Sequence, residues 1–73
     1  MENVEMIAVS SSNILEIGYD EANQSVYVRF TNNTLYCYKD VPQMEFNGLF
    51  NAPSVGSYLH RNFKNVYPYE RIE

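Results

Sequence analysis

The sequence SVYVRFTNNTLYCY, residues 25–38, contains two alternating runs on either side of an asparagine pair. Val26, Val28 and Phe30 recur at every second position, which is the period of a half-buried β-strand. Residues 34–39 form a second strand-like run. Asparagine tolerates a positive φ better than most residues, so the pair at 32–33 indicates a tight turn. The stretch therefore predicts an antiparallel hairpin.

Two turns can join these strands, and they place the tyrosines on opposite faces of the sheet. A two-residue turn at 32–33 pairs Val28 with Cys37 and creates an exposed aromatic and cationic platform. The members of that platform would be Tyr27, Arg29, Tyr36 and Tyr38. A three-residue loop over 31–33, with Asn33 left-handed, pairs Val28 with Tyr36 and turns Tyr36 and Tyr38 toward the core. We favour the second register, because so small a core needs the area of the tyrosine rings.

The residues before the hairpin predict further strands. Residues 14–19 alternate, with Leu15, Ile17 and Tyr19 on the apolar side, and a polar connection at 20–24 leads into the hairpin. Residues 7–9 predict an additional edge strand. Neighbouring strands with short connections give an antiparallel meander of three to four strands.

The hydrophobic period changes to that of a helix after Asp40. Pro42 fits the first turn of a helix, and Phe46, Leu49 and Phe50 follow at helical spacing. Ser54 is the predicted N-cap of a second helix. One side of that helix is expected to hold Val55, Tyr58, Leu59, Asn62 and Phe63, and the other Ser57, His60, Arg61 and Lys64. We expect an α+β fold with both helices on one face of the sheet, residues 7–73 being one domain and residues 1–6 an N-terminal extension.

Composition narrows the classes of function. The chain has 73 residues and a formal net charge of -4, and no apolar run approaches the length of a membrane span. Its first residues carry acid where a secretory signal carries base, and its single cysteine suits a reducing compartment. We therefore expect a cytoplasmic protein without a membrane partner.

Catalytic and cofactor motifs are missing from the sequence. One histidine and one cysteine cannot supply a four-ligand zinc site, and the three isolated glycines match no phosphate-binding loop. Cys37 and His60 could form a nucleophile pair, but a strand cysteine is more often a small apolar residue. The sequence predicts no catalytic residue, no metal, no small-molecule cofactor and no enzymatic activity.

Cations and aromatic rings interleave toward the C-terminus. Arg61, Lys64 and Arg71 flank Tyr58, Tyr67 and Tyr69, and this is a composition that binds single-stranded nucleic acid. The first N–H groups of the second helix, after Ser54, would attract an anion, and Gly56 would allow its close approach. The acidic isoelectric point of about 4.8 opposes this interpretation. A solvated helix face is the alternative.

Motifs along nearly the whole chain, from Val9 to Ile72, resemble the KTSC domain. The resemblance is carried by Ser11-Ser12-Asn13-Ile14, Gly18-Tyr19-Asp20, Val26-x-Val28-x-Phe30, Tyr36-Cys37-Tyr38, Val41-Pro42, Leu49, Ala52, Ser54, Gly56, Tyr58, Lys64 and Tyr67-Pro68-Tyr69. Asn33 stands where the family tends to have glycine, and Leu59 and His60 stand where it has phenylalanine and asparagine. Members occur as free-standing bacterial or phage proteins and at the C-terminus of some lysyl-tRNA synthetases. The resemblance thus implies RNA binding without a known activity.

Two functional hypotheses follow from these observations. The first is a non-enzymatic module that binds RNA, such as tRNA, weakly through the second helix and the C-terminal segment. Arg61, Lys64 and Arg71 would contact phosphates, Tyr67 and Tyr69 would stack on bases, and the segment at Ser54 and Gly56 would bind an anion. The second is a module for protein interaction or self-association with no nucleic-acid role.

Overall fold

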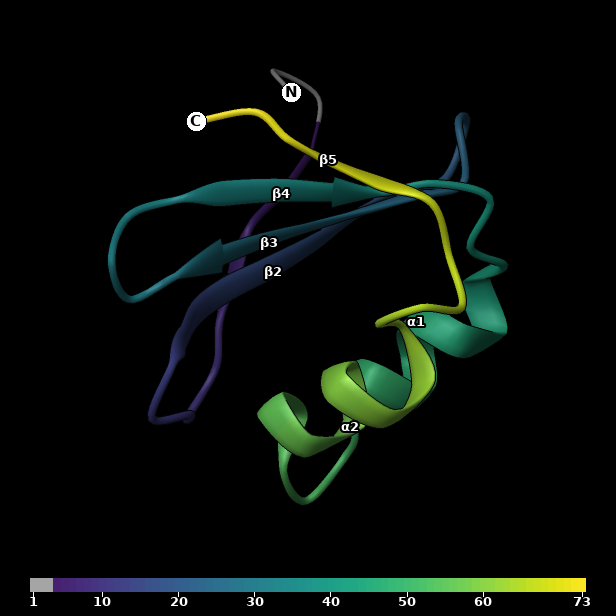
Figure 1. The fold of residues 1–73 in the computed structure, drawn as a ribbon. Helices are drawn as coiled ribbons and strands as arrows, with labels where there is room; N and C mark the ends of the chain where they lie inside the picture. Colours follow the sequence, from purple (N-terminus) through teal and green to yellow (C-terminus); the bar gives the residue numbers. More distant parts are fainter. Residues whose placement is uncertain (1–3) are drawn as a thin grey trace.

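The computed structural model describes residues 4–73 and consists of a sheet with two helices on one face (Figure 1). Five antiparallel strands follow one another in sequence order across the sheet. They are β1 (Ile7–Ala8), β2 (Ile14–Asp20), β3 (Ser25–Phe30), β4 (Leu35–Tyr38) and β5 (Tyr69–Arg71). Helices α1 (Gln43–Phe50) and α2 (Val55–Asn62) lie between β4 and β5 in the chain. The predicted α+β architecture is confirmed, but the prediction of three to four strands was too low.

The β3–β4 hairpin adopts the register with a three-residue loop. Val28 lies opposite Tyr36, and the backbone N–H of Phe30 donates to the carbonyl of Thr34 at 2.9 Å. Asn33 has a φ of 72°, and its N–H donates to the Phe30 carbonyl at 2.8 Å. Because opposite residues of a pair share a face, Tyr36 lies on the helix-bearing side with Val28. The predicted register is confirmed.

Strand β2 contains a bulge that corrects the predicted alternation. Ile14 lies opposite Phe30, whereas Glu16 lies opposite Arg29, so Leu15 is the extra residue. Ile14 is 1% exposed and Leu15 is 44% exposed, the reverse of the prediction. A bulge moves the residues before it to the opposite face, and simple alternation does not anticipate that change.

The observed starts of both helices agree with the predicted starts within one residue. Pro42 occupies the N-cap position of α1 rather than its first turn, and its carbonyl accepts from the Glu45 N–H at 3.0 Å. Ser54 caps α2 as predicted, and its Oγ accepts from the Ser57 N–H at 3.3 Å. A capping hydroxyl satisfies a donor that the first helical turn leaves without a partner.

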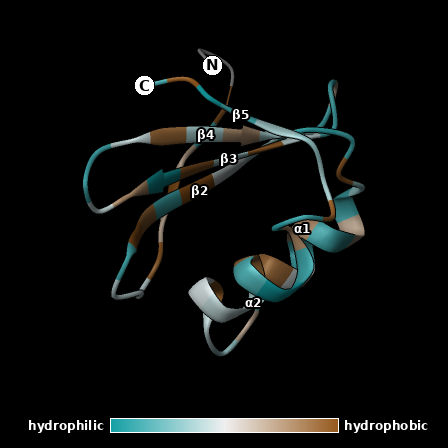
Figure 2. Ribbon diagram, in the orientation of Figure 1, coloured by the Kyte–Doolittle hydropathy of each residue, from teal (hydrophilic) through white to brown (hydrophobic). Residues whose placement is uncertain are grey.

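The core lies between the sheet and the two helices. Figure 2 shows hydrophobic residues along strands β2–β4 and both hydrophilic and hydrophobic residues along α2. Phe63, directly after α2, is fully buried and packs edge-on against Tyr38 at a ring-centroid distance of 5.6 Å. The other members of the cluster are Ile14, Ile17, Val26, Val28, Val41, Phe46, Leu49, Val55 and Leu59. Both helices therefore cover one face, as predicted.

The opposite face of the sheet is partly covered by the N-terminal segment, which passes behind the strands in Figure 1. A side chain at Gly18 would lie 2.6 Å from Met6 Sδ and 2.8 Å from Val4 Cγ1, so only glycine fits under this segment. Cys37 points to this face and is buried. Of the predicted extension, residues 1–3 lie outside the described residues, and residues 4–6 lie against the sheet. Within the described chain, neither helix has the length and apolar character to cross a membrane.

Candidate functional site

A groove runs between α2 and the sheet at the end of the sheet that holds Phe30. We call it the tyrosine groove. Its lining consists of Asn13, Phe30, Tyr36, Tyr38, Gly56, Leu59, His60, Lys64 and Tyr69. The strands supply its aromatic rings, and its basic side chains are His60 on α2 and Lys64, two residues after the end of α2. The groove therefore combines aromatic and basic groups from segments that are far apart in the sequence.

The aromatic rings of the groove form a connected row that leads from the core to the surface. The Tyr69 ring lies 5.8 Å from that of Tyr36 and 5.5 Å from that of Tyr38, tilted by less than 40° to both. Tyr36 in turn meets Phe30 edge-on at 5.5 Å. Tyr38 is 7% exposed, whereas Tyr69 is 55% exposed. Tyr69 is thus an exposed ring held in place by neighbours on its inner side.

Strand β5 brings Tyr69 to this position, and the sequence did not predict that strand. Tyr69 lies opposite Tyr38 and Arg71 lies opposite Tyr36, so both side chains of β5 share the face of the groove. The Lys39 N–H donates to the Pro68 carbonyl at 2.8 Å at one end of this pairing. The pairing satisfies backbone groups along β4, which would otherwise be an open edge.

The wall of the groove comes from one stripe of α2 and the residue that follows it closely. Gly56 and His60 are four residues apart on α2, a spacing that places them on the same side of the helix, and Lys64 lines the same groove two residues after α2 ends. A side chain at Gly56 would lie 2.9 Å from Asn13 Oδ1, so this glycine lets the loop before β2 lie against α2. The role of Gly56 in the structure is therefore close packing, which sets one end of the groove.

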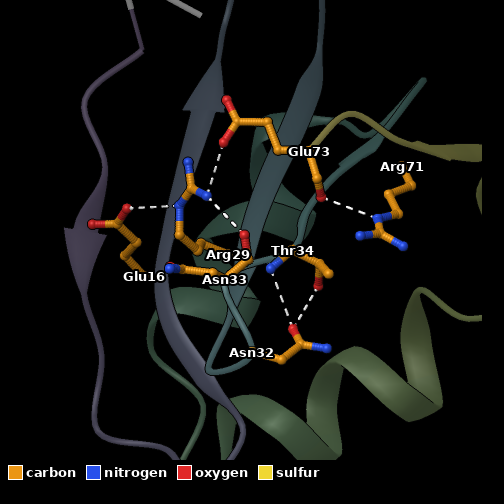
Figure 3. Close-up of polar contacts among 7 residues, drawn as sticks. All are labelled: Glu16, Arg29, Asn32, Asn33, Thr34, Arg71 and Glu73. Atoms are coloured by element: carbon orange, nitrogen blue, oxygen red, sulfur yellow. Dashed lines mark hydrogen bonds and ion pairs between the residues drawn. The ribbon is translucent and has the colours of Figure 1, made fainter.

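The ion pairs on the outer face of the sheet involve two of the five cations. Arg29 contacts Glu73 at 2.9 Å and Glu16 at 3.5 Å, and it donates to the Asn33 carbonyl at 3.0 Å (Figure 3). Lys39 contacts Glu70 at 2.8 Å, and this carboxylate raises the pKa of the lysine above its ordinary value. These two charges are largely compensated by adjacent acids.

The remaining cations have no side-chain carboxylate within 4.0 Å among residues 4–73. They are Arg61, Lys64 and Arg71. Arg71 donates from Nε to the main-chain oxygen of Glu73 at 3.0 Å (Figure 3). All three side chains are exposed. The cations without a side-chain carboxylate partner therefore lie around α2 and β5, away from the paired charges of the outer face.

The structure brings some of the predicted site residues together and separates others. Lys64, Gly56 and Tyr69 line the tyrosine groove, and Arg71 lies next to it on β5. Ser54 and Arg61 line a neighbouring polar groove together with residues 10–13. The two grooves adjoin, because Asn13, Gly56 and His60 line both.

Tyr67 lies apart from this surface. Its ring packs on Phe63 at a centroid distance of 5.2 Å, and its hydroxyl lies 3.4 Å from Glu45 Oε1. The same carboxylate accepts a short hydrogen bond from Tyr58. This bond to Glu45 raises the pKa of Tyr58, and desolvation together with Glu45 raises the pKa of Tyr67. Glu45 thus joins α1 to α2 and to the segment that leads into β5.

Phe30, Tyr36, His60 and Asn13 are groove residues that the sequence did not assign to the site. The favoured hairpin register predicted which face of the sheet holds Tyr36. It did not predict that α2 would leave the Tyr36 ring in the groove between helix and sheet. His60 was expected on a solvated helix face, and Cys37 lies on the other side of the sheet from it. No nucleophile pair is therefore formed by these two residues. Within the part of the chain that the structure describes, no three acidic, histidine or cysteine side chains gather to hold a metal ion.

Comparisons with known proteins agree with this architecture. The family model of the KTSC domain matches residues 10–67 of this chain. An uncharacterized protein of Stutzerimonas stutzeri is 35% identical over 68 residues, which are 92% of this chain and 96% of that protein. A lysine–tRNA ligase of Trichormus variabilis is 31% identical over 67 residues, and the match spans 92% of this chain but 12% of the ligase.

The crystal structure of a KTSC domain protein from Yersinia pestis superimposes with a TM-score of 0.92 at 30% sequence identity. The superposition covers 96% of this chain and 99% of that one. The similarity therefore extends over the complete fold, including the elements that form the tyrosine groove. On the family match and these full-length similarities, the chain belongs to the KTSC domain family.

Proposed function

We propose that this KTSC domain is a non-enzymatic module that binds RNA through α2 and β5. The observation that carries the proposal is the separation of charge over the surface. Arg29 and Lys39 are paired with side-chain carboxylates, whereas Arg61, Lys64 and Arg71 have no side-chain carboxylate within 4.0 Å among the described residues. Cations without a side-chain carboxylate partner, next to the exposed ring of Tyr69, suit a ligand with phosphates and flat bases.

The relative in Trichormus variabilis supports RNA as the ligand. Its name, lysine–tRNA ligase, places tRNA among its substrates, and a segment equal to 12% of its length matches this chain. A module within a larger RNA-binding enzyme can act at low intrinsic affinity, because the rest of the enzyme raises its effective concentration. We extend the same ligand class, with tRNA as its first representative, to this chain.

The small number of cations sets the expected strength of binding. Each phosphate contact on a single strand contributes about 0.7 to the slope of log affinity against log salt concentration. Three contacts give a slope of about -2, so affinity should fall roughly 20-fold between about 50 and 200 mM salt. Binding should therefore be weak and clearly dependent on salt.

Fluorescence anisotropy with labelled tRNA at low and moderate salt tests the proposal. The variant Lys64→Ala should weaken binding and make the salt slope shallower by about 0.7. Lys39→Ala is the matched control, because it removes the same charge from a lysine paired with Glu70 on the outer face. Absence of binding by the wild type at low salt contradicts RNA binding. Equal losses in the two variants contradict the assignment to α2.

The second candidate function is self-association or the binding of another protein. Helix α1 supports it by exposing two large apolar side chains, Met44 at 83% and Phe50 at 42%. Sedimentation velocity over a wide concentration range checks self-association, which requires a mass above the 8.5 kDa of one chain. A mass of one chain at all concentrations contradicts self-association.

A further inference from the structure

We infer that the tyrosine groove takes an unpaired nucleobase stacked on Tyr69, so that the domain selects single-stranded over duplex RNA. This inference rests on the RNA binding proposed above and specifies the form of RNA. It goes beyond that proposal by assigning the base contact to Tyr69 and by requiring that the base be unpaired. The argument starts from the support of Tyr69.

Tyr69 is held in one position before any ligand arrives. Its backbone is part of β5, and its ring leans on Tyr36 and Tyr38 at 5.8 and 5.5 Å. It is nevertheless 55% exposed. A flat ring that is already ordered loses little conformational entropy when a second flat ring stacks on it. The exposed part of Tyr69 is therefore a prepared surface for an aromatic ligand.

The surroundings of Tyr69 suit a nucleotide better than a plain apolar ring. Lys64 and His60 line the same groove, and Arg71 follows two residues later on the same face of β5. The two side chains with fixed positive charge, Lys64 and Arg71, have no side-chain carboxylate within 4.0 Å among the described residues. A base on Tyr69 would thus have its 5′ or 3′ phosphate within the field of these cations.

Base pairing is what distinguishes the two forms of RNA at this site. Within an A-form duplex both faces of a base are covered by its neighbours, and the deep major groove does not admit side chains. A base can stack on a protein ring only when it is unpaired or is first extruded, which costs a few kcal/mol per base. Three cations cannot supply enough phosphate binding to offset that cost repeatedly. The groove therefore favours single strands.

A tryptophan at position 69 provides a direct readout of stacking. The chain has no tryptophan, so Tyr69→Trp carries a single indole fluorophore at the site. The matched control is Leu15→Trp, on a strand residue that is 44% exposed and does not line the groove. An unstructured 12-nucleotide RNA should quench the fluorescence of Tyr69→Trp and leave that of Leu15→Trp unchanged. The same RNA in a duplex should quench neither.

Affinity measurements with two further variants complete the test. Tyr69→Phe retains the ring and should bind the single strand as the wild type does, whereas Tyr69→Ala should lose about five- to 100-fold. Circular dichroism checks that Tyr69→Ala is folded, and Tyr69→Trp keeps the test valid if it is not. Equal affinity for duplex and single strand would overturn this inference while RNA binding remained. Absence of binding to either form would overturn both.

Discussion

Replacing Gly48 by alanine should destabilise the domain, although alanine is the better helix former. Gly48 lies in the interior of α1, where the exchange by itself would stabilise the helix by about 1 kcal/mol. The new methyl group, however, would overlap the hydroxyl of Tyr58 and lie 3.0 Å from its Cζ. That hydroxyl donates to Glu45, so the clash would disrupt the contact between the helices.

The two effects can be weighed against each other. A hydrogen bond to an ionised group contributes about 1.5–3 kcal/mol, with the lower end applying to this partly exposed pair. Subtracting the gain in helix propensity leaves a loss of about 0.5 kcal/mol, and displacement of the Tyr58 ring raises the net loss to about 1 kcal/mol. In a domain of this size such a loss lowers Tm by about 4–8 °C.

The background Tyr58→Phe provides the control. Without the hydroxyl, the alanine methyl meets only the edge of the ring, and a shift of a few tenths of an ångström accommodates it. Gly48→Ala should then be neutral or stabilising by about 0.5 kcal/mol, with a coupling of about 1–2 kcal/mol between the two sites. Urea denaturation of all four proteins, followed by circular dichroism, measures this cycle. Equal stabilisation by Gly48→Ala in both backgrounds would refute the reasoning.

Three further predictions concern the hairpin, the groove and alkaline stability. Asn33 has a φ of 72°, so Asn33→Ala should lower the free energy of unfolding by about 1 kcal/mol, whereas Asn33→Gly should not. Urea midpoints measure both effects, and equal losses in the two variants would contradict the argument from backbone strain. In Gly56→Ala the added Cβ would lie 2.9 Å from Asn13 Oδ1, so Asn13 should move. The amide resonances of residues 10–13 in NMR spectra should shift as a result, and unchanged resonances would contradict this packing. Burial, the largest cause, raises the pKa of Tyr38, so its neutral form stabilises the fold below about pH 10 and this contribution is lost as the pH rises further. Urea midpoints at about pH 8 and 11 should show that loss, and Tyr38→Phe should reduce it; an equal loss in the variant would assign the effect to other groups.

The local sequence was sufficient for the hairpin, the helices and the class of fold. Alternating residues in 25–38 determined the faces of β3 and β4 once the loop length was chosen, and the need to bury tyrosine area selected that length. Ser54 marked the start of α2 because a capping hydroxyl acts within a single turn. These features depend on contacts between residues that are close in the chain.

The bulge and the last strand depended on distant contacts. In the sequence, Leu15 follows the apolar alternation of Ile17 and Tyr19. In the structure, Leu15 is the extra residue of a bulge in the pairing of β2 with β3, and Ile14 is buried instead. Strand β5 has only three residues, all exposed, which is too few for a periodic signal. It forms because the chain returns from α2 along the open edge of β4, whose backbone groups need partners.

The candidate site shows the same division. The sequence identified Arg61, Lys64 and Arg71 by their spacing among tyrosines, but it could not tell which cations would meet carboxylates on the outer face. It also treated Tyr67 and Tyr69 alike. The return of the chain placed Tyr67 on Phe63 and Glu45, and Tyr69 on Tyr36 and Tyr38. Residue type and period are local properties, whereas exposure and charge compensation arise only when segments far apart in the chain pack together.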